Sequence, residues 1–196
     1  MTDDTSLPRT PELMSRDDTA LLVVDVQEKL LPVIRNRSQI VWNIRRLIDG
    51  ARILGVEIGA TEQYPQGLGP TTGLLAERLD EIPSKLRFSC GECGGVFRRF
   101  IDSGRHKVLV VGIEAHVCVG QTVLDLLGNG YQVFVAVDAV GSRREIDYQT
   151  ALRRMDSAGA TLTTTEAALF EWCEVAGTPE FKEISKLVRE TPPEED

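Results

Sequence analysis

The sequence predicts a single α/β domain with three layers, in which helices cover both faces of a mostly parallel β-sheet. Three observations support this α/β/α fold class. Continuous apolar runs of strand length, such as Ala20–Val26 and Lys107–Ile113, are typical of strands that are buried on both faces. Segments with helical periodicity alternate with these runs, as in right-handed βαβ units. The length of 196 residues and the hydrophobic content of 42% suit one core.

The first half of the chain starts with the strand Ala20–Val26, whose last part carries the carboxylate of Asp25. The clearest helix spans about Ser38 to Leu54, because its apolar residues recur at steps of three and four. Ser38 is a candidate N-cap, and Gly55 is a suitable stop. The expected elements that follow are a strand at Val56–Ala60, an irregular Gly/Pro-rich loop at Gln63–Pro70 and a weaker helix at Thr72–Leu79.

The second half repeats the alternation. A short strand near Leu86–Ser89 is followed by the segment CGECGG and a helix, and then by the apolar strand Lys107–Ile113. The remaining expected elements are a helix at Val117–Leu127 closed by the sequence GNG, a strand in Tyr131–Asp138, a helix near Tyr148–Ala158 and a strand near Thr161–Thr165. This pattern shows no internal repeat and no second domain.

Both ends of the chain are polar and acidic, so we expect a flexible segment over 1–18, one domain over 19–188 and an acidic tail over 189–196. The first residues have neither the order of a secretory signal nor the Arg-rich pattern of a transit peptide, so a cytoplasmic location is expected. No apolar run approaches the ~20 residues that cross a bilayer, so no membrane association is expected.

Charge and composition narrow the partners. Twenty-two Lys and Arg residues against 30 Asp and Glu residues give a net charge of -8, which argues against general binding to nucleic acid or anionic membranes. The four cysteines and two histidines show no paired CxxC or HxxxH spacing, so we predict no metal. Neither GxGxxG nor GxxxxGK[ST] is present, and no cofactor is predicted.

Three reactive side chains fall where the carboxyl ends of parallel strands open into a crevice, which is where ligands of doubly wound sheets collect. These side chains are Asp25, Lys85 and Cys118. Because Cys118 opens a helix, we expect its thiolate to be favoured before substrate arrives. Asp25 would accept and return a proton, and Lys85 would balance the charge. The alternative is that all three have ordinary structural roles.

Two neighbouring features have simpler interpretations. Cys90 and Cys93 form the motif CGEC, which has the spacing of a redox pair or of half a zinc site, but unremarkable thiols in a Gly-rich turn are favoured. His116 lies two residues before Cys118 and is a candidate base. Since neighbouring positions in a tight loop point in different directions, packing of the loop is favoured for His116.

Five segments in the same order resemble one known family. They are ALLVVDVQ with Asp25, TEQYPQGLGPT from Thr61, SKLRFS with Lys85, VGIEAHVCVGQTVLDLL with Cys118, and VFVAVDAVGSR ending at Arg143. Over about 19–170 the chain resembles the isochorismatase-like cysteine hydrolases, which include nicotinamidases and carbamoylsarcosine amidohydrolase-like enzymes.

The resemblance implies a six-stranded, Rossmann-like parallel sheet and the catalytic triad Asp25, Lys85 and Cys118. It also implies a cis peptide bond between Ile113 and Glu114, an oxyanion hole made by the backbone amides of Glu114 and Cys118, and assembly into a homo-oligomer, a dimer or larger.

The chain departs from the nicotinamidases at one place. Where their metal site uses an Asp and two His residues after the second strand, this sequence has Thr61, Glu62, Gln63 and Tyr64. The segments from Thr61 and from Cys118 look more like the branch of isochorismatase domain-containing proteins. Isochorismatases that cleave a vinyl ether can lack the cysteine, so Cys118 favours chemistry of the amide type.

The sequence therefore predicts a metal-independent cysteine hydrolase that acts on a small amide or a related carbonyl compound through a thioester. The alternative is a catalytically silent or redox-sensing member of the fold that acts by binding or oligomerisation. Five residues are candidates for lining the substrate pocket, with ordinary loop packing as the alternative for each: Gln27, Tyr64, Arg87, Phe88 and Gln121.

Overall fold

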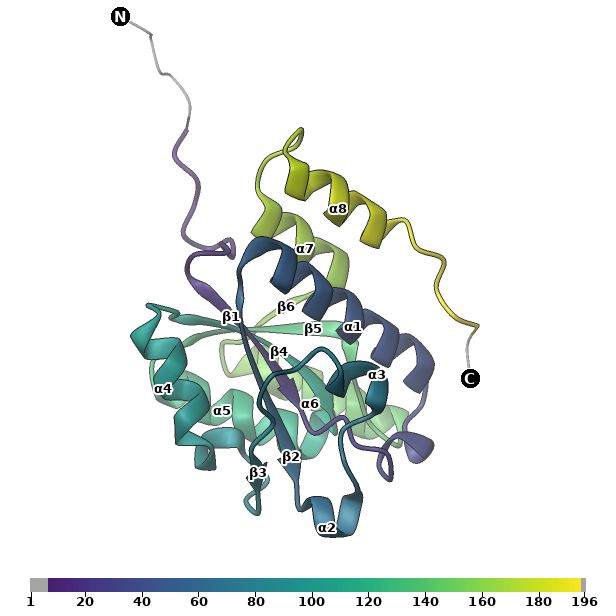
Figure 1. The fold of residues 1–196 in the computed structure, drawn as a ribbon. Helices are drawn as coiled ribbons and strands as arrows, with labels where there is room; N and C mark the ends of the chain where they lie inside the picture. Colours follow the sequence, from purple (N-terminus) through teal and green to yellow (C-terminus); the bar gives the residue numbers. More distant parts are fainter. Residues whose placement is uncertain (1–6, 195–196) are drawn as a thin grey trace, which may run out of the picture.

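The computed structural model describes residues 7–194 of the chain. One six-stranded sheet, parallel throughout, has the strand order β3-β2-β1-β4-β5-β6. The strands are β1 (Thr19–Val24), β2 (Glu57–Gln63), β3 (Ser84–Lys85), β4 (Lys107–Ile113), β5 (Gln132–Gly141) and β6 (Thr161–Thr163). Helices lie on both sides of the sheet (Figure 1). The predicted three-layer α/β/α fold is confirmed.

The helices divide into two groups, each with its own apolar core against one face of the sheet. The first face carries α1 (Arg37–Leu54), α7 (Thr165–Cys173) and α8 (Pro179–Val188). The second face carries α4 (Gly94–Asp102), α5 (Gly120–Gly128) and α6 (Glu145–Ser157). The shorter elements are η1 (Leu31–Val33), α2 (Pro65–Leu68), α3 (Gly73–Ala76), η2 (Cys90–Glu92) and the π-helical turn η3 (Ala115–Val119).

The two central strands open the crevice that holds the candidate site. After β1 the chain leads into α1 on one face, whereas after β4 it leads into α5 on the other. Chains that depart in opposite directions leave a crevice between neighbouring strand ends. Gly112 in β4 has φ +121°, and a Cβ atom there would lie 2.1 Å from the carbonyl oxygen of Val24. Only glycine therefore lets β4 approach β1 this closely.

The second and third strands differ from the prediction. β2 continues to Gln63 beyond the expected end at Ala60, and the predicted loop holds the single turn α2. The third strand is Ser84–Lys85, and the prediction of Leu86–Ser89 was wrong. The reason is that the chain turns after Lys85: the carbonyl groups of Arg87 and Phe88 point back at the Lys85 ammonium group.

Some helix boundaries in the structure also differ from the predicted ones. α1 begins at Arg37 behind Asn36, so Ser38 lies inside the helix, while Gly55 ends it with φ 74° as predicted. The helices α7 and α8 were not predicted, and they pack on α1 through an apolar core that includes Trp172 and Ile184. The predicted helix at Val117–Leu127 is divided into η3 and α5.

The terminal segments make specific contacts where the structure describes them. Met14 is fully buried, and the buried Lys107 ammonium group donates to the carbonyl oxygens of Pro11 and Leu13. These contacts speak against a flexible segment over that part of 1–18, and residues 1–6 lie outside the described residues. At the other end, Glu190 pairs with Arg45 of α1, and residues 195–196 lie outside the described part. The domain boundaries themselves stay a prediction.

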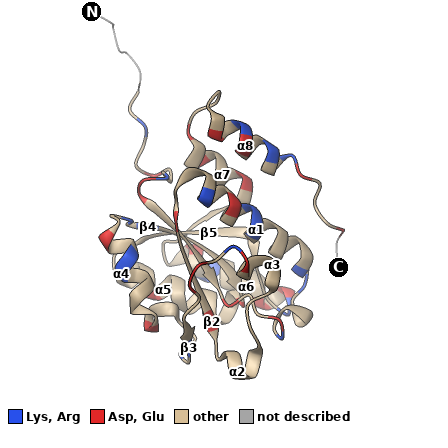
Figure 2. Cartoon of the chain, viewed as in Figure 1, with Lys and Arg blue, Asp and Glu red and all other residues tan. Residues whose placement is uncertain are grey.

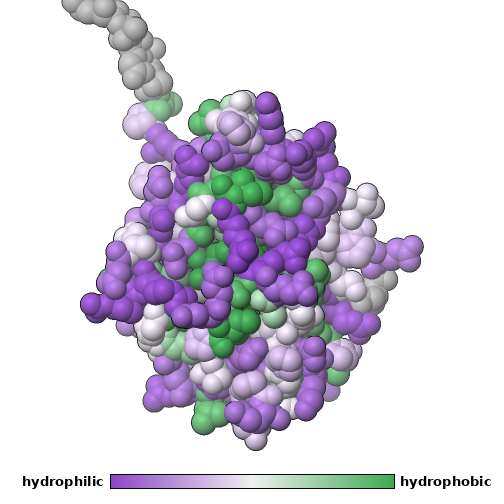
Figure 3. Space-filling model, in the orientation of Figure 1, coloured by the Kyte–Doolittle hydropathy of each residue, from purple (hydrophilic) through white to green (hydrophobic). Residues whose placement is uncertain are grey.

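The surface is mixed in charge and polarity. Acidic and basic residues are interspersed on α1, α7 and α8 (Figure 2), and the face in Figure 3 is mainly hydrophilic with small apolar groups. Within 7–194, no helix has the length and apolar character that a bilayer crossing requires.

Candidate active site

The structure brings Asp25, Lys85 and Cys118 together at the carboxyl end of the sheet. Asp25 follows β1 in a left-handed conformation with φ 53°. Lys85 reaches it from β3, past the end of β2, and its Nζ lies 2.7 Å from Oδ2 of Asp25. Both side chains are fully buried. Cys118 is 5% exposed, and the negative charge of Asp25 acts on its thiol and raises the pKa of that group.

Acceptors surround the Lys85 ammonium group. Besides Asp25, its Nζ lies 2.8 Å from Oε1 of Gln63, 2.7 Å from the carbonyl oxygen of Phe88 and 3.3 Å from that of Arg87. Burial acts to lower the pKa of Lys85, but the charge of Asp25 and its hydrogen bond outweigh burial and raise the pKa. Lys85 is therefore a permanent cation at neutral pH, and it supplies the positive charge that a buried carboxylate requires.

The second carboxylate oxygen of Asp25 has its own donor. The hydroxyl group of Thr61 in β2 lies 2.8 Å from Oδ1, and the backbone amide of Asp25 donates to the carbonyl oxygen of the same threonine at 3.2 Å. Donors on both oxygens fix the plane of the carboxylate. Asp25 is thus held as an oriented acceptor beside the Cys118 thiol.

Cys118 lies in η3, the tight turn between β4 and α5. The peptide bond that precedes this turn, Ile113–Glu114, is cis, as the resemblance implies. The carbonyl oxygen of Glu114 accepts hydrogen bonds from the amides of Val117 and Val119. The carbonyl oxygen of Cys118 accepts one from Thr122 of α5 at 2.7 Å. Both ends of the turn are therefore tied to their neighbours, and the position of the sulfur is defined.

The protonation state of Cys118 differs from the expectation. Burial, followed by the negative charge of Asp25, raises the pKa of the thiol well above its ordinary value, and the positive charge of Lys85 opposes this only in part. The expected preformed thiolate is wrong. The position of Cys118 near a helix start does not lower the pKa, because burial of the thiol and the charge of Asp25 outweigh it.

Glu114 contributes a second ion pair at the start of the turn. Its carboxylate accepts two hydrogen bonds from Arg143, at 2.9 Å from Nε and 3.0 Å from Nη2. This fork-to-fork geometry links the end of β5 to the residue that follows β4. The assignment of the Glu114 and Cys118 amides to an oxyanion hole stays a prediction.

The candidate pocket residues have different surroundings. Gln27 is fully buried and its amide bonds the backbone of Gln63 and Gly69, so it shapes the segment after β2. Tyr64 is half exposed, and its ring lies over Gly67.

The other three candidates are exposed. Arg87 and Phe88 flank the site, because their carbonyl groups bind Lys85. Gln121 lines, with His116, a cavity of about 150 Å³ between η3, α5 and α6. Gln27 and Tyr64 also adjoin the triad, because their backbone amides donate to the carbonyl oxygens of Asp25 and Lys85 at 2.8 and 3.0 Å. The substrate-binding role of all five residues stays a prediction.

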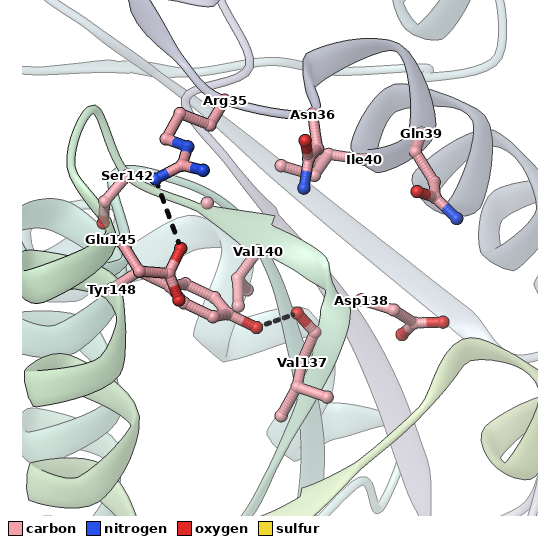
Figure 4. Close-up of a pocket in the computed structure, with 11 residues that line it drawn as sticks. Arg35, Asn36, Gln39, Ile40, Val137, Asp138, Val140, Ser142, Glu145 and Tyr148 are labelled. Carbon is pink, nitrogen blue, oxygen red and sulfur yellow. Dashed lines mark hydrogen bonds and ion pairs between the residues drawn. The ribbon is translucent and has the colours of Figure 1, made fainter. Parts of the chain in front are cut away.

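A cavity of about 280 Å³ lies at the end of β5 and is lined by no member of the triad (Figure 4). Arg35 and Glu145 face each other across it with 3.7 Å between charged atoms, and the Tyr148 hydroxyl donates to the carbonyl oxygen of Val137. His116 is hydrogen-bonded to Ser142 at the cavity wall, at 3.0 Å. That contact supports packing of the loop by His116.

The side chains that form hydrogen bonds to the triad residues were not predicted from the sequence. Thr61 and Gln63 each bond a triad member, and Thr122 bonds the backbone of both Cys90 and Cys118. A signal was present for the first two: polar residues at alternate positions of one strand share a face. Within the described range, no three His, Cys, Asp or Glu residues gather as they would around a metal ion. Cys90 and Cys93 are free thiols.

Fold and site together define an α/β protein with a cysteine set beside a buried Asp–Lys pair at the sheet's central crevice. A family model described as Isochorismatase domain matches residues 19–167. The chain belongs to the isochorismatase domain family.

Relatives agree with this assignment. The chain is 40% identical over 180 residues to mouse isochorismatase domain-containing protein 2A, covering 91% of this chain and 86% of the relative. The solved structure described as MAR1 ribonuclease from Caenorhabditis elegans is 42% identical, with a TM-score of 0.86 and coverage of 93% and 95%. The Escherichia coli YcaC gene product, described as an octameric hydrolase of unknown specificity, shares the fold at 23% identity, with a TM-score of 0.82 and coverage of 92% of each chain.

Proposed function

We propose that this protein is a metal-independent cysteine hydrolase that cleaves a small amide or a related carbonyl compound through a thioester. The observation that carries the proposal is that the buried Cys118 thiol lies within the electrostatic influence of Asp25, a carboxylate that is paired with a fully buried ammonium group. A buried ion pair beside a nucleophile has a large desolvation cost, and such perturbed clusters concentrate at active sites.

In the first half of the reaction, the Cys118 sulfur attacks the carbonyl carbon while its proton moves to Asp25. The C–S bond forms, and the carbonyl π electrons move to oxygen. The backbone amides of Glu114 and Cys118 stabilise this oxyanion. Asp25 then gives its proton to the departing nitrogen, the C–N bond breaks, and ammonia or an amine leaves a thioester on Cys118.

In the second half, Asp25 takes a proton from water, and the hydroxide attacks the thioester carbon. The C–S bond breaks, the acid product leaves, and the proton held by Asp25 returns to the Cys118 sulfur. Lys85 carries its proton in the resting site, since the charge of Asp25 raises its pKa there. Its role is to keep the Asp25 carboxylate ionised and oriented.

The surroundings favour a small substrate. The Cys118 side chain is almost fully buried, and the flanking exposed groups are Arg87 and the half-exposed Phe88. The guanidinium group of Arg87 suits a substrate carboxylate, and the ring of Phe88 suits an apolar portion.

Three alternatives are weaker. A silent scaffold has no need for the buried Asp25–Lys85 pair. A peroxide-sensing thiol requires a low pKa, whereas that of Cys118 is raised. The ribonuclease described for the Caenorhabditis elegans structure would bind a polyanion, which the net charge of -8 disfavours here.

The deciding experiment measures ammonia or amine release from a panel of small amides, ureas and carbamates, with wild type and Cys118→Ala and with and without a chelator. We expect release that depends on Cys118 and is insensitive to the chelator. Full activity of Cys118→Ala would refute the covalent route, and loss of activity with the chelator would refute metal independence. A parallel arm with single-stranded RNA tests the ribonuclease alternative, and we expect no cleavage.

We also propose that the chain forms a homo-oligomer. Leu86 and Phe88 are exposed by 71% and 52% at the carboxyl end of the sheet, and an octamer is described for a protein with this fold. Analytical ultracentrifugation at micromolar concentration tests this, and a monomer at all concentrations would refute it.

A further inference from the structure

The CGEC motif contains a cysteine that touches the candidate site, although the proposed mechanism does not use it. Cys90 is fully buried, and its sulfur lies 3.3 Å from Oγ1 of Thr61. The same hydroxyl oxygen lies 2.8 Å from Oδ1 of Asp25. The three polar groups therefore form a continuous buried path from η2, across β2, to the proposed base.

The number of protons on each group determines which group donates and which accepts in these hydrogen bonds. A carboxylate only accepts hydrogen bonds, so the Thr61 hydroxyl group gives its single proton to Asp25. With that proton used, the hydroxyl oxygen can only accept at the contact with Cys90, and the thiol is the donor. Burial, followed by the negative charge of Asp25, raises the pKa of Cys90 to about 11, so this thiol keeps its proton at neutral pH.

We propose that Thr61 and Cys90 are positioning residues, whose hydrogen bonds hold the Asp25 carboxylate ionised and aimed at Cys118. This inference deepens the proposed function and rests on it for the role of Asp25. Hydrogen bonds that run in one direction polarise each other, and they are stronger in a buried site than in water. A donor to the charged form of a carboxylate also favours that form.

The remaining groups that face Asp25 have separate effects. Lys85 from β3 supplies positive charge at the other carboxylate oxygen, and Cys118 from η3 is the proton donor in the reaction. The η2 turn is also tied to the nucleophile, because Thr122 accepts from the amide of Cys90 at 2.9 Å and donates to the carbonyl oxygen of Cys118 at 2.7 Å. One network thus sets the spacing between base and nucleophile.

Cys93 provides a matched control within the same motif. It is a buried thiol three residues from Cys90, but its side chain belongs to the apolar core beneath α4 and α5. The proposal therefore predicts opposite outcomes for two cysteines of similar burial. Cys90→Ala removes the terminal donor of the chain, whereas Cys93→Ala leaves the chain intact.

The test is carbon-13 NMR at neutral pH on protein labelled at the aspartate carboxyl carbons, in which Asp25 is assigned from the resonance that is lost in Asp25→Asn. No substrate is needed. In Thr61→Val the carboxyl resonance of Asp25 should shift, because the carboxylate loses a hydrogen-bond donor. Thr61→Ser keeps the hydroxyl group and should restore the wild-type chemical shift. Cys90→Ala should move the resonance by less, and Cys93→Ala should not move it.

An unmoved resonance in Thr61→Val, or equal changes in Thr61→Val and Thr61→Ser, would overturn the proposal. If Thr61→Val does not fold, equal chemical shifts in Cys90→Ala and Cys93→Ala overturn it. Where a substrate is known, Thr61→Val should lower kcat roughly tenfold at unchanged KM. Because the NMR readout is independent of turnover, an inactive wild type refutes the proposed function while the chemical shifts still decide the role of Thr61 and Cys90.

Discussion

Replacing Lys85 by Met tests whether the centre of the site is a buried ion pair. Both members of the Asp25–Lys85 pair are fully buried, and methionine fills the space of the lysine stem without its charge. Removing one partner of a buried pair costs about 4 kcal/mol, because the other charge stays behind without compensation. For a chain of 196 residues this corresponds to a decrease of about 8–16 °C in Tm.

The dependence on pH gives the sign of the effect. Because the pKa of Lys85 is raised in the folded wild type, the contribution of Lys85 to stability is complete below about pH 10.4 and is lost as the pH rises through the folded pKa. The stability deficit of Lys85→Met should therefore decrease above that pH.

Urea unfolding of Lys85→Met and wild type from about pH 7 to 11.5, followed by circular dichroism, measures this dependence. Lys182→Met, at an exposed lysine of α8, is the matched control and should follow the wild type. Equal stability of Lys85→Met and wild type at neutral pH, or a deficit that grows on the alkaline side, would refute the buried ion pair.

Three further predictions concern the supports of the site. Arg143→Lys should lower kcat about tenfold in the hydrolase assay, with Tm unchanged in thermal scans, because the half-exposed arginine holds Glu114 by a bidentate pair that lysine cannot form. Gly112→Ala should yield no soluble folded protein in expression trials, because its Cβ would overlap the carbonyl oxygen of Val24 at a φ of +121°. Lys107→Met should increase amide hydrogen exchange over residues 9–18 at least tenfold, because that lysine holds the carbonyl oxygens of Pro11 and Leu13.

Most strands of the sheet could be predicted because they are short apolar runs, which are typical of buried parallel strands. β4 matches its predicted range at both ends, since all of its residues are buried and its apolar run directly follows the charged Lys107. β3 was misplaced because only two residues pair there, and the exposed Leu86 and Phe88 imitate a strand pattern. The position of such a short edge strand depends on the contact between the Lys85 side chain and Asp25 of a distant segment, and local sequence patterns do not reveal this contact.

The positions of Asp25, Lys85 and Cys118 at the strand ends could be predicted from the sequence, but the direction of the pKa shift of Cys118 could not. Asp25 and Cys118 are 93 positions apart, so nothing local indicates that the carboxylate contacts the sulfur. Local reasoning placed the cysteine at a helix start and predicted a lowered pKa. In the folded site, burial and a nearby anion act in the opposite direction. Thr61 and Cys90 were missed for the same reason, since each gains its role from a contact with a distant element.

A protonated resting thiol is consistent with catalysis in this site when the charges of all three groups are considered together. The resting cluster holds one ammonium, one carboxylate and one neutral thiol. In the proposed attack the thiol proton moves to Asp25 as the sulfur bonds to carbon, so the carboxylate charge is replaced by the oxyanion charge and the net charge is unchanged. One positive and one negative charge are therefore present at each stage. Since the attack brings no net charge into this buried site, the reaction avoids the desolvation cost that a separate thiolate and carboxylate would carry.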